Sequence, residues 1–272
     1  MDNKELCFVA YCDLVYQKYV PYYVYFCNRA YPESKIKIFL DCEIDKSLRS
    51  SFDLVSKNSN VSFYDNTFKD IPHSITKLKA SRFLLDSSYF KDIKYIYIGD
   101  IDLFISKEKI SLLEQHLIHC NETSLCYSNA VRDLDYNRLT GLHFIKTDEY
   151  FEKMDAIITK YYEALRAESL SVSDQHKGCL DEMMLYKMVE EANCGFPKNY
   201  FRPHHGLHIG VWRKKKPFSL SQEFLNEHGH DNYINYYRDF LEAEKEDGYK
   251  LLLKNIPLDE IIRMKQCLKI SL

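Results

Sequence analysis

Short apolar runs alternate with helical stretches along the first half of the chain, and this alternation restricts the fold more than any other feature. Strands are expected where four of these runs occur, at residues 6–11, 36–40, 61–64 and 95–98, the first and last of them buried. Helices are expected between them, and strand–helix–strand units of this kind stack into a mainly parallel sheet. The chain is therefore predicted to be an α/β protein with a Rossmann-like, mainly parallel mixed sheet flanked by helices.

The second half continues this pattern and then changes character. A further strand is expected at residues 141–146, and helices at 148–166 and 180–191. From residue 217 onward the sequence is charged and has a helical pattern. We expect a core domain over residues 1–216 and a C-terminal helical appendage over residues 217–272.

Charge and cysteine usage exclude several classes of protein. The chain has 37 Lys and Arg against 40 Asp and Glu, a net charge of −3 and one short basic run, which is unlike a nucleic-acid-binding protein. The first residues are acidic where a signal peptide is basic, and no apolar run is long enough to span a bilayer. The nine cysteines form no C-x-x-C pair, which argues against a disulfide framework or a zinc knuckle. We expect a cytoplasmic protein with reduced thiols.

Two aspartates follow the strand at residues 95–98. The segment 95–105 reads YIYIGDIDLFI, so Asp100 and Asp102 lie between two apolar runs. Residues i and i+2 of an extended chain share a face, so both carboxylates should project together from the strand end. Such a pair suits Mn²⁺ or Mg²⁺, and ligands of open α/β sheets bind at the carboxyl ends of strands. The alternative is a pair of solvated acids in a turn or a helix cap, although carboxylates between apolar runs need a compensating partner.

Together with two upstream segments, this motif resembles the GT-A nucleotide-sugar glycosyltransferases, and among them the group around glycosyltransferase family 8. The upstream segments read FVAYCDLVY at residues 8–16 and ASRFLL at residues 80–85. The resemblance implies a GT-A catalytic domain that binds a nucleoside-diphosphate-sugar and a divalent metal. In that case Tyr11, Asp13 and Tyr16 would contact the nucleoside, Arg82 the donor's phosphate or sugar, Asp100 the ribose or the metal, and Asp102 the metal.

Each of these assignments has a structural alternative. Asp13 could cap a helix, Tyr16 could be a core ring, and Arg82 could form a surface ion pair. The resemblance also implies that His143 donates a hydrogen bond to a hydroxyl of the donor sugar, with a hydrogen-bonded core histidine as the alternative. Both readings stay open for all four residues.

Two acids at the start of the helix at 180–191 resemble the acidic helix start near the reacting carbon in this group. Asp181 or Glu182 would then act as the base of an inverting reaction or stabilise the positive charge of a retaining one, with Arg82 as a further catalytic residue. The alternative is that both acids only stabilise the helix N-terminus, where the helix dipole favours negative charge.

The segment 201–213 reads FRPHHGLHIGVWR and contains three histidines beside two glycines. Members of the resembled group that use a metal carry a His before a Gly and then a basic residue. His208, Gly210 and Arg213 fit that order, which implies that His208 binds the metal and Arg213 the diphosphate. The spacing is one residue shorter than usual, so His205 and His204 remain rival metal ligands. Lys214, Lys215 and Lys216 are expected to be solvated.

The sequence thus indicates a metal-dependent hexosyltransferase that moves a sugar from a nucleoside diphosphate, most simply UDP, to a hydroxyl of a glycan or lipid-linked glycan. Retention of anomeric configuration and a role in bacterial-type surface polysaccharide synthesis follow from the resemblance. Contact with the inner face of the membrane is a further possibility for a lipid-linked acceptor. Two alternatives stay open: a non-catalytic nucleotide-sugar or glycan-binding module of the same fold, and a phosphotransferase or phosphatase that uses the D-x-D pair.

Overall fold

A computed structural model of the chain describes seven segments of it. These segments are residues 3–57, 60–72, 79–133, 137–170, 180–198, 205–213 and 230–267. In this part of the chain, no helix combines the length and the apolar composition that crossing a membrane requires.

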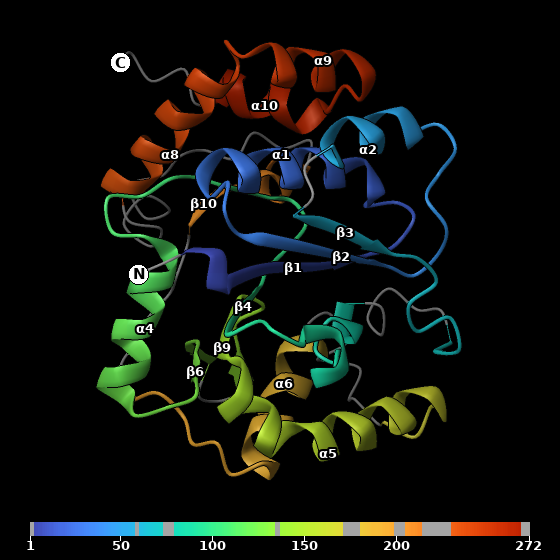
Figure 1. Cartoon of the computed structure of the whole chain (residues 1–272), viewed down its shortest axis with the longest axis vertical. Coiled ribbons are helices and arrows are strands. Elements are labelled where there is room, and N and C mark those ends of the chain that lie inside the picture. Colours follow the sequence, from blue (N-terminus) through green and yellow to red (C-terminus); the bar gives the residue numbers. More distant parts are fainter. Residues whose placement is uncertain are drawn as a thin grey trace.

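A six-stranded sheet forms the centre of the described structure (Figure 1). β1, β2, β3 and β4 pair in parallel, while β9 is antiparallel to both of its neighbours. This arrangement confirms the predicted fold class, a mainly parallel mixed sheet flanked by helices. In the order of the sheet, the strands are β3 (Val61–Tyr64), β2 (Lys35–Leu40), β1 (Leu6–Cys12), β4 (Tyr95–Ile98), β9 (His143–Lys146) and β6 (Tyr127–Ser128).

Helices cover both faces of this sheet, which is why all seven residues of β1 are buried. α1 (Val20–Ala30) and α2 (Arg49–Val55) lie on one face, and α5 (Thr147–Arg166) and α6 (Leu180–Glu191) on the other (Figure 1). α4 (Leu112–Thr123) packs beside β6, and short 3₁₀ segments occur at η1 (Asn3–Glu5), η2 (Gln17–Tyr19) and η3 (Ser87–Phe90).

The buried positions of α5 follow the helical period. Its buried side chains include Tyr150, Met154, Ile158, Tyr161 and Leu165, which are three or four residues apart and so line one side of the helix. The predicted helices at 148–166 and 180–191 are confirmed by α5 and α6. Between the strands at 61–64 and 95–98 the sequence indicates a helix over about residues 74–85. Its first part falls on residues 73–78, which lie outside the described residues, and in the described part the helix ends at Ser81.

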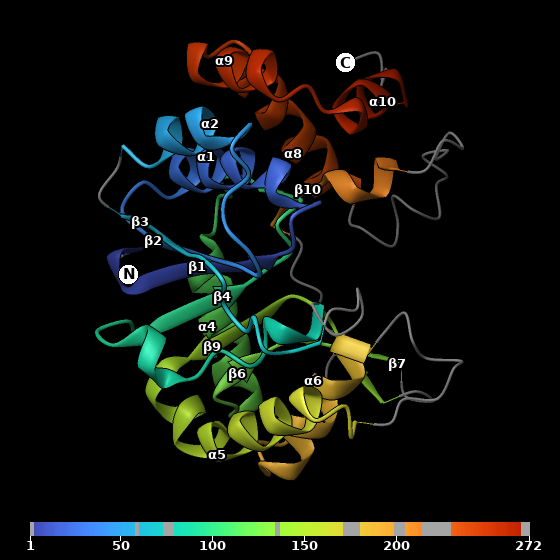
Figure 2. The ribbon, with the colours of Figure 1, turned by 90° about the vertical axis from the view of Figure 1, so that its right-hand side faces the viewer.

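The C-terminal part is helical, as the pattern after residue 217 predicts. It contains α8 (His230–Ala243), α9 (Asp247–Asn255) and α10 (Asp259–Cys267), which lie beyond α1 on the same side of the sheet (Figures 1 and 2). These helices share one hydrophobic cluster with α1 and β5. Within it, the ring of Phe26 stacks on Phe104 at 4.5 Å between centroids and on Phe240 at 6.1 Å. The domain boundary at residue 216 stays a prediction, but the helical appendage and the core domain share their hydrophobic interior.

Two short strand pairs outside the main sheet were not expected from the sequence. β5 (Leu103–Ile105) pairs antiparallel with β10 (Gly206–His208), so that His208 lies opposite Leu103, next to Asp102 in the chain. Gly206 permits this pairing, because a Cβ atom there would collide with the carbonyl oxygen of Phe104. The second pair joins β7 (Val131–Asp133) to β8 (Arg138–Leu139). After β10 the chain enters the 3₁₀ segment η5 (Ile209–Arg213).

Candidate active site

The strand order of the sheet reverses between β1 and β4. β2 and β3 follow β1 on one side, and the chain then crosses to place β4 on the other side of β1. Open α/β sheets bind ligands at the carboxyl ends of the strands that flank such a switch point. Here the residues that directly follow the two strands are Asp13 after β1 and the turn from Gly99 to Asp102 after β4.

Three potential metal ligands meet at this point. One ligand atom each from Asp100, Asp102 and His208 lies within 4.8 Å of the others. The imidazole Nε2 of His208 is 3.2 Å from Oδ1 of Asp102. Asp102 is buried, whereas the side chains of Asp100 and His208 are about one-third exposed. Two carboxylates and one imidazole, partly open to solvent, form a donor set that fits a divalent cation.

The two aspartates converge through a turn. We expected the extended chain of β4 to continue through both residues, but β4 ends at Ile98 and the backbone N–H of Leu103 donates a hydrogen bond to the carbonyl of Asp100 at 3.1 Å. The backbone N–H of Ile209 donates to the carbonyl of Asp102 at 2.8 Å and holds the following segment against the turn. The carboxylates therefore meet because of this turn, and the β5–β10 pairing brings His208 beside them.

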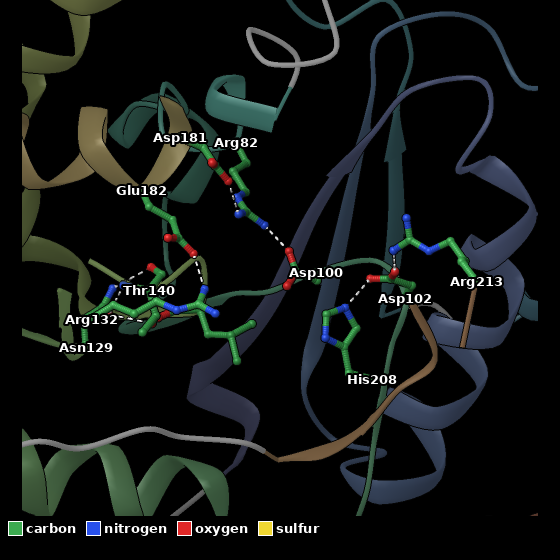
Figure 3. Close-up of polar contacts among 11 residues, drawn as sticks. Arg82, Asp100, Asp102, Asn129, Arg132, Thr140, Asp181, Glu182, His208 and Arg213 are labelled. Carbon is green, nitrogen blue, oxygen red and sulfur yellow. Dashed lines mark hydrogen bonds and ion pairs between the residues drawn. The ribbon is translucent and has the colours of Figure 1, made fainter. Parts of the chain in front are cut away.

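Arg213 lies on the other side of Asp102 (Figure 3). Its guanidinium forms an ion pair with Oδ2 of Asp102, donates to the hydroxyl of Tyr16, and lies over the Tyr16 ring at 4.8 Å from the centroid. Gly210 makes this approach possible, because a Cβ atom there would collide with both Asp102 and Arg213. Tyr16 and Arg213, which are far apart in the sequence, thus lie together near the carboxyl ends of β1 and β4.

The charges of this cluster shift its ionisation. Burial opposes the charge on Asp102, but His208 and Arg213 outweigh this effect and lower its pKa to about 2. Burial also opposes protonation of His208, yet Asp102 and Asp100 raise the pKa of its imidazole. The pKa of Tyr16 is raised by burial, although Arg213 acts in the opposite direction. The cluster therefore keeps the buried carboxylate of Asp102 ionised.

Arg82 links the aspartate turn to helix α6. One Nη atom forms an ion pair with Asp100, and the other lies 2.6 Å from Oδ2 of Asp181 (Figure 3). Arg82 is 7% exposed, so it is a buried bridge between two carboxylates, in contrast to the surface ion pair considered above. Gly141 provides the space for it, because a Cβ atom at that position would lie 2.5 Å from the Arg82 guanidinium.

Glu182, the second acid of α6, contacts two arginines of the β7–β8 pair. Its Oε1 is 2.8 Å from Arg132 and its Oε2 is 3.4 Å from Arg138. Burial raises the pKa of the Glu182 carboxyl, and the two arginines only partly oppose this effect. Sequence reasoning missed both arginines, because no motif marks them and only the hairpin brings them to α6.

The other predicted site residues lie in different surroundings. Asp13 accepts a hydrogen bond from the backbone N–H of Tyr16 at 2.9 Å, and Tyr11 donates its hydroxyl to the carbonyl of Thr67 at 3.3 Å. His143 is fully buried, with its two ring nitrogens 2.9 Å from the Asn129 amide and 3.1 Å from the Tyr150 hydroxyl. These contacts correspond to the alternative of a core histidine, and the sugar contact of His143 stays a prediction.

Of the two competing histidines that the structure describes, His208 meets the aspartates. The buried His205 has its Nδ1 on the Glu108 carboxylate and its Nε2 3.1 Å from Nε2 of His116. Its ring therefore belongs to a separate polar cluster, and this contrasts with its expected place among the metal ligands. His204 and Lys214–Lys216 lie outside the described residues.

Comparison with known proteins gives only distant likenesses. No protein-family model and no curated protein matches the sequence. Among solved structures, the chain is similar to the galactosyltransferase LgtC in complex with donor and acceptor sugar analogues, with 14% identity, a TM-score of 0.46, and coverage of 83% of this chain and 95% of that one. It is similar to the glycosyltransferase GlyE of Streptococcus pneumoniae TIGR4, with 15% identity, a TM-score of 0.44, and coverage of 66% and 43%. Both of these proteins are glycosyltransferases.

Proposed function

We propose that this chain is a metal-dependent glycosyltransferase that moves a hexose from a nucleoside-diphosphate-sugar to a hydroxyl of a glycan or lipid-linked glycan. The observation that carries the proposal is the convergence of Asp100, Asp102 and His208 at the switch point of the sheet, with Arg213 and Tyr16 beside them. A metal site flanked by an arginine and an aromatic ring has the groups needed to bind a nucleoside diphosphate. UDP is the proposed nucleotide, and Mn²⁺ or Mg²⁺ the proposed metal.

Asp100, Asp102 and His208 would hold the metal. Their oxygen and nitrogen donors fit such an ion, and one ligand atom of each lies within 4.8 Å of the others. When bound, the metal would supply Lewis-acid stabilisation of the diphosphate leaving group. His208 must be neutral to ligate, so its raised pKa means that proton release would accompany metal binding at mildly acidic pH.

Arg213 and Tyr16 are assigned to the nucleotide. The guanidinium of Arg213 carries a fixed charge and a planar set of donors, which matches the oxygens of a diphosphate. Tyr16 presents an aromatic ring and a hydroxyl next to it, which suits the nucleoside. Asp13 and Tyr11, which flank this position at the end of β1, are proposed to line the same part of the donor site.

The acids of α6 are assigned to the reacting sugar. Asp181 is 2.6 Å from Arg82, so its role would be to hold that arginine toward the donor. Glu182 has a raised pKa because it is buried, which suits a group that exchanges a proton or stabilises positive charge at the anomeric carbon. A retaining reaction is the proposed stereochemical course, and bacterial-type surface polysaccharide synthesis in the cytoplasm is the proposed setting.

Thermal unfolding in the presence of nucleotide-sugars tests this proposal. UDP-, GDP-, CMP- and dTDP-sugars would each be added with and without Mn²⁺, because a ligand that binds the folded state raises the melting temperature. The expected result is a Mn²⁺-dependent rise with the UDP-sugars that disappears in Asp102→Ala. Asp53→Ala, which removes an exposed acid of α2, is the matched control and should keep the rise. If no donor raises the melting temperature of the wild-type chain, the proposed function is wrong.

A non-catalytic nucleotide-sugar-binding module is the second candidate. Arg82 pairs with Asp100, and Arg213 pairs with Asp102. These ion pairs favour the module, because the protein's own arginines balance the charge of the two aspartates at the site. Both functions predict donor binding, but only the enzyme breaks the bond between sugar and diphosphate. Release of UDP from the bound donor, measured with Mn²⁺ over many protein equivalents, would identify the enzyme, and stoichiometric binding without release would identify the module.

A further inference from the structure

We propose that Glu260 and Arg263 of the C-terminal helix α10 are positioning residues for the donor site. They hold the two separate segments of this site at a fixed position relative to each other. This inference rests on the proposed function. One segment is η2, which follows Tyr16, and the other is η5, which ends in Arg213. In the sequence these segments are far apart, and α10 contacts both of them.

Arg263 binds the segment that carries Arg213. Its Nε donates a hydrogen bond of 2.7 Å to the backbone carbonyl oxygen of Trp212. Trp212 is 2% exposed, and Ile261 and Met264 on the neighbouring turns of α10 are buried in the same hydrophobic cluster. The residue directly before the proposed phosphate ligand is therefore fixed by both a polar bond and close packing to α10.

Glu260 binds the segment that follows Tyr16. Its Oε1 accepts a hydrogen bond of 2.9 Å from the hydroxyl of Tyr19 and lies 3.4 Å from Nζ of Lys18. Glu260 is 5% exposed, and its pKa is lowered because its own backbone N–H, Tyr19 and Lys18 together outweigh the effect of burial. A buried carboxylate held ionised in this way gives η2 a directed attachment to the helix.

The two attachments are linked within α10. Glu260 and Arg263 are one turn apart, with Oε1 of the first 3.9 Å from an Nη of the second. Tyr16, just before η2, and Arg213, just after Trp212, contact each other at the site. The result is a closed circuit that runs from α10 through η2 to Tyr16, then to Arg213, and back through η5 to α10.

Such a circuit is needed because neither segment is rigid by itself. η2 has three residues and η5 has five, and 3₁₀ turns of this length have weak internal hydrogen bonding. A shift of about 1 Å in a binding group can cost on the order of 10²-fold in rate. Support from a helix outside the sheet, anchored by its buried face, would keep the aromatic ring and the guanidinium at one separation, which a nucleoside diphosphate of fixed length requires.

The single tryptophan of the chain, Trp212, makes this circuit directly measurable. Its fluorescence and its quenching by acrylamide report on η5 whether or not a ligand binds. The variants would be Arg263→Ala, Arg263→Lys, Glu260→Ala and Glu260→Gln. The matched control is Lys265→Ala, which removes an ion pair of 2.8 Å between α10 and Glu244 that faces away from η2 and η5.

Arg263→Ala is expected to make Trp212 more accessible to acrylamide and to weaken Mn²⁺-dependent UDP binding about tenfold, as misplacement of a ligand-binding group does. In steady-state kinetics the donor KM should rise more than kcat falls, and the acceptor KM should stay unchanged. Arg263→Lys, which keeps one donor, should recover part of the affinity. Glu260→Ala should weaken UDP binding, and Glu260→Gln, whose amide oxygen still accepts from Tyr19, should weaken it less. Lys265→Ala should behave like the wild type.

The inference is overturned if Arg263→Ala and Lys265→Ala have the same quenching and the same UDP affinity. It is also overturned if both substitutions at Arg263 lower the melting temperature but leave donor KM unchanged, since that result means a structural role only. Should Arg263→Ala fail to fold, Arg263→Lys and Glu260→Gln give the same comparison. If the wild-type chain binds no nucleotide while quenching still rises only in the Arg263 and Glu260 variants, the attachment of η5 to α10 stands and the proposed function falls.

Discussion

Acid should destabilise this protein through His143, and the size of the effect follows from its burial. The ring is fully buried, and burial together with Arg82 lowers its pKa from 6.5 to about 3. Below pH 6.5 the unfolded chain binds a proton at this residue and the folded chain does not, so stability falls as the pH falls. Each pH unit corresponds to about 1.36 kcal/mol, so lowering the pH from 6.5 to 5 should cost about 2 kcal/mol at this residue.

The substitution His143→Gln isolates this contribution. Its free energy of unfolding at pH 7 should be lower than that of the wild type, because the contacts with Asn129 and Tyr150 are altered. Between pH 7 and pH 5, however, it should lose about 2 kcal/mol less than the wild type does. Urea unfolding at pH 7, 6 and 5, followed by far-ultraviolet circular dichroism, measures both quantities. The pKa of His116 is also lowered, chiefly by burial and to a smaller extent by His143, so most of its contribution cancels in the comparison.

Tyr150→Phe is the matched control. It removes the hydroxyl 3.1 Å from Nε2 of the ring but leaves the buried imidazole in place, so its pH dependence should match that of the wild type. If His143→Gln loses as much stability on acidification as the wild type, the ring is protonated in the folded state and the reasoning from burial is refuted. A donor KM that rises in His143→Gln but stays constant in Tyr150→Phe would instead favour the predicted sugar contact.

Three further substitutions test other contacts. Gly210→Ala should abolish Mn²⁺-dependent nucleotide binding, because the new Cβ collides with Asp102 and Arg213; calorimetric titration with unchanged affinity would contradict this. Arg82→Met should lower the free energy of unfolding by about 3–5 kcal/mol, since it leaves the buried Asp181 without its partner. A loss below about 1 kcal/mol in urea would mean that the bridge is solvent-exposed in solution. Phe26→Ala should cost about 3–5 kcal/mol, because its ring is buried between two others, and chemical denaturation at neutral pH checks this value.

The strands of the sheet could be predicted closely from their short, mostly apolar runs. The expected strands at 61–64 and 95–98 coincide with β3 and β4, and the helix expected at 180–191 coincides with α6. β5, β7, β8 and β10 could not be predicted in this way, because they have two or three residues each. Strands this short have no recognisable period, and pairing with a distant segment determines whether they form.

The candidate site was predictable only in part for the same reason. The acids of the D-x-D motif and those of α6 are visible as local patterns, since each pair is adjacent or nearly adjacent in the chain. The partner of each acid comes from elsewhere: Arg82 joins Asp100 to Asp181, and Arg132 and Arg138 reach Glu182 from a hairpin. No local sequence pattern indicates which acids these arginines contact.

The choice among the histidines shows most clearly what the sequence determines and what depends on the tertiary structure. The sequence by itself determined that an α/β sheet would form, that Asp100 and Asp102 would lie at the carboxyl end of β4, and that a histidine of the segment 201–213 was a candidate to join them. Only the tertiary structure decided that His208 meets the aspartates while His205 turns to Glu108 and His116. The physical reason is that the alternation of apolar and polar residues acts over a few residues and specifies local elements. The meeting of side chains far apart in the chain depends on the register of β5 with β10, which forms only when the whole core packs.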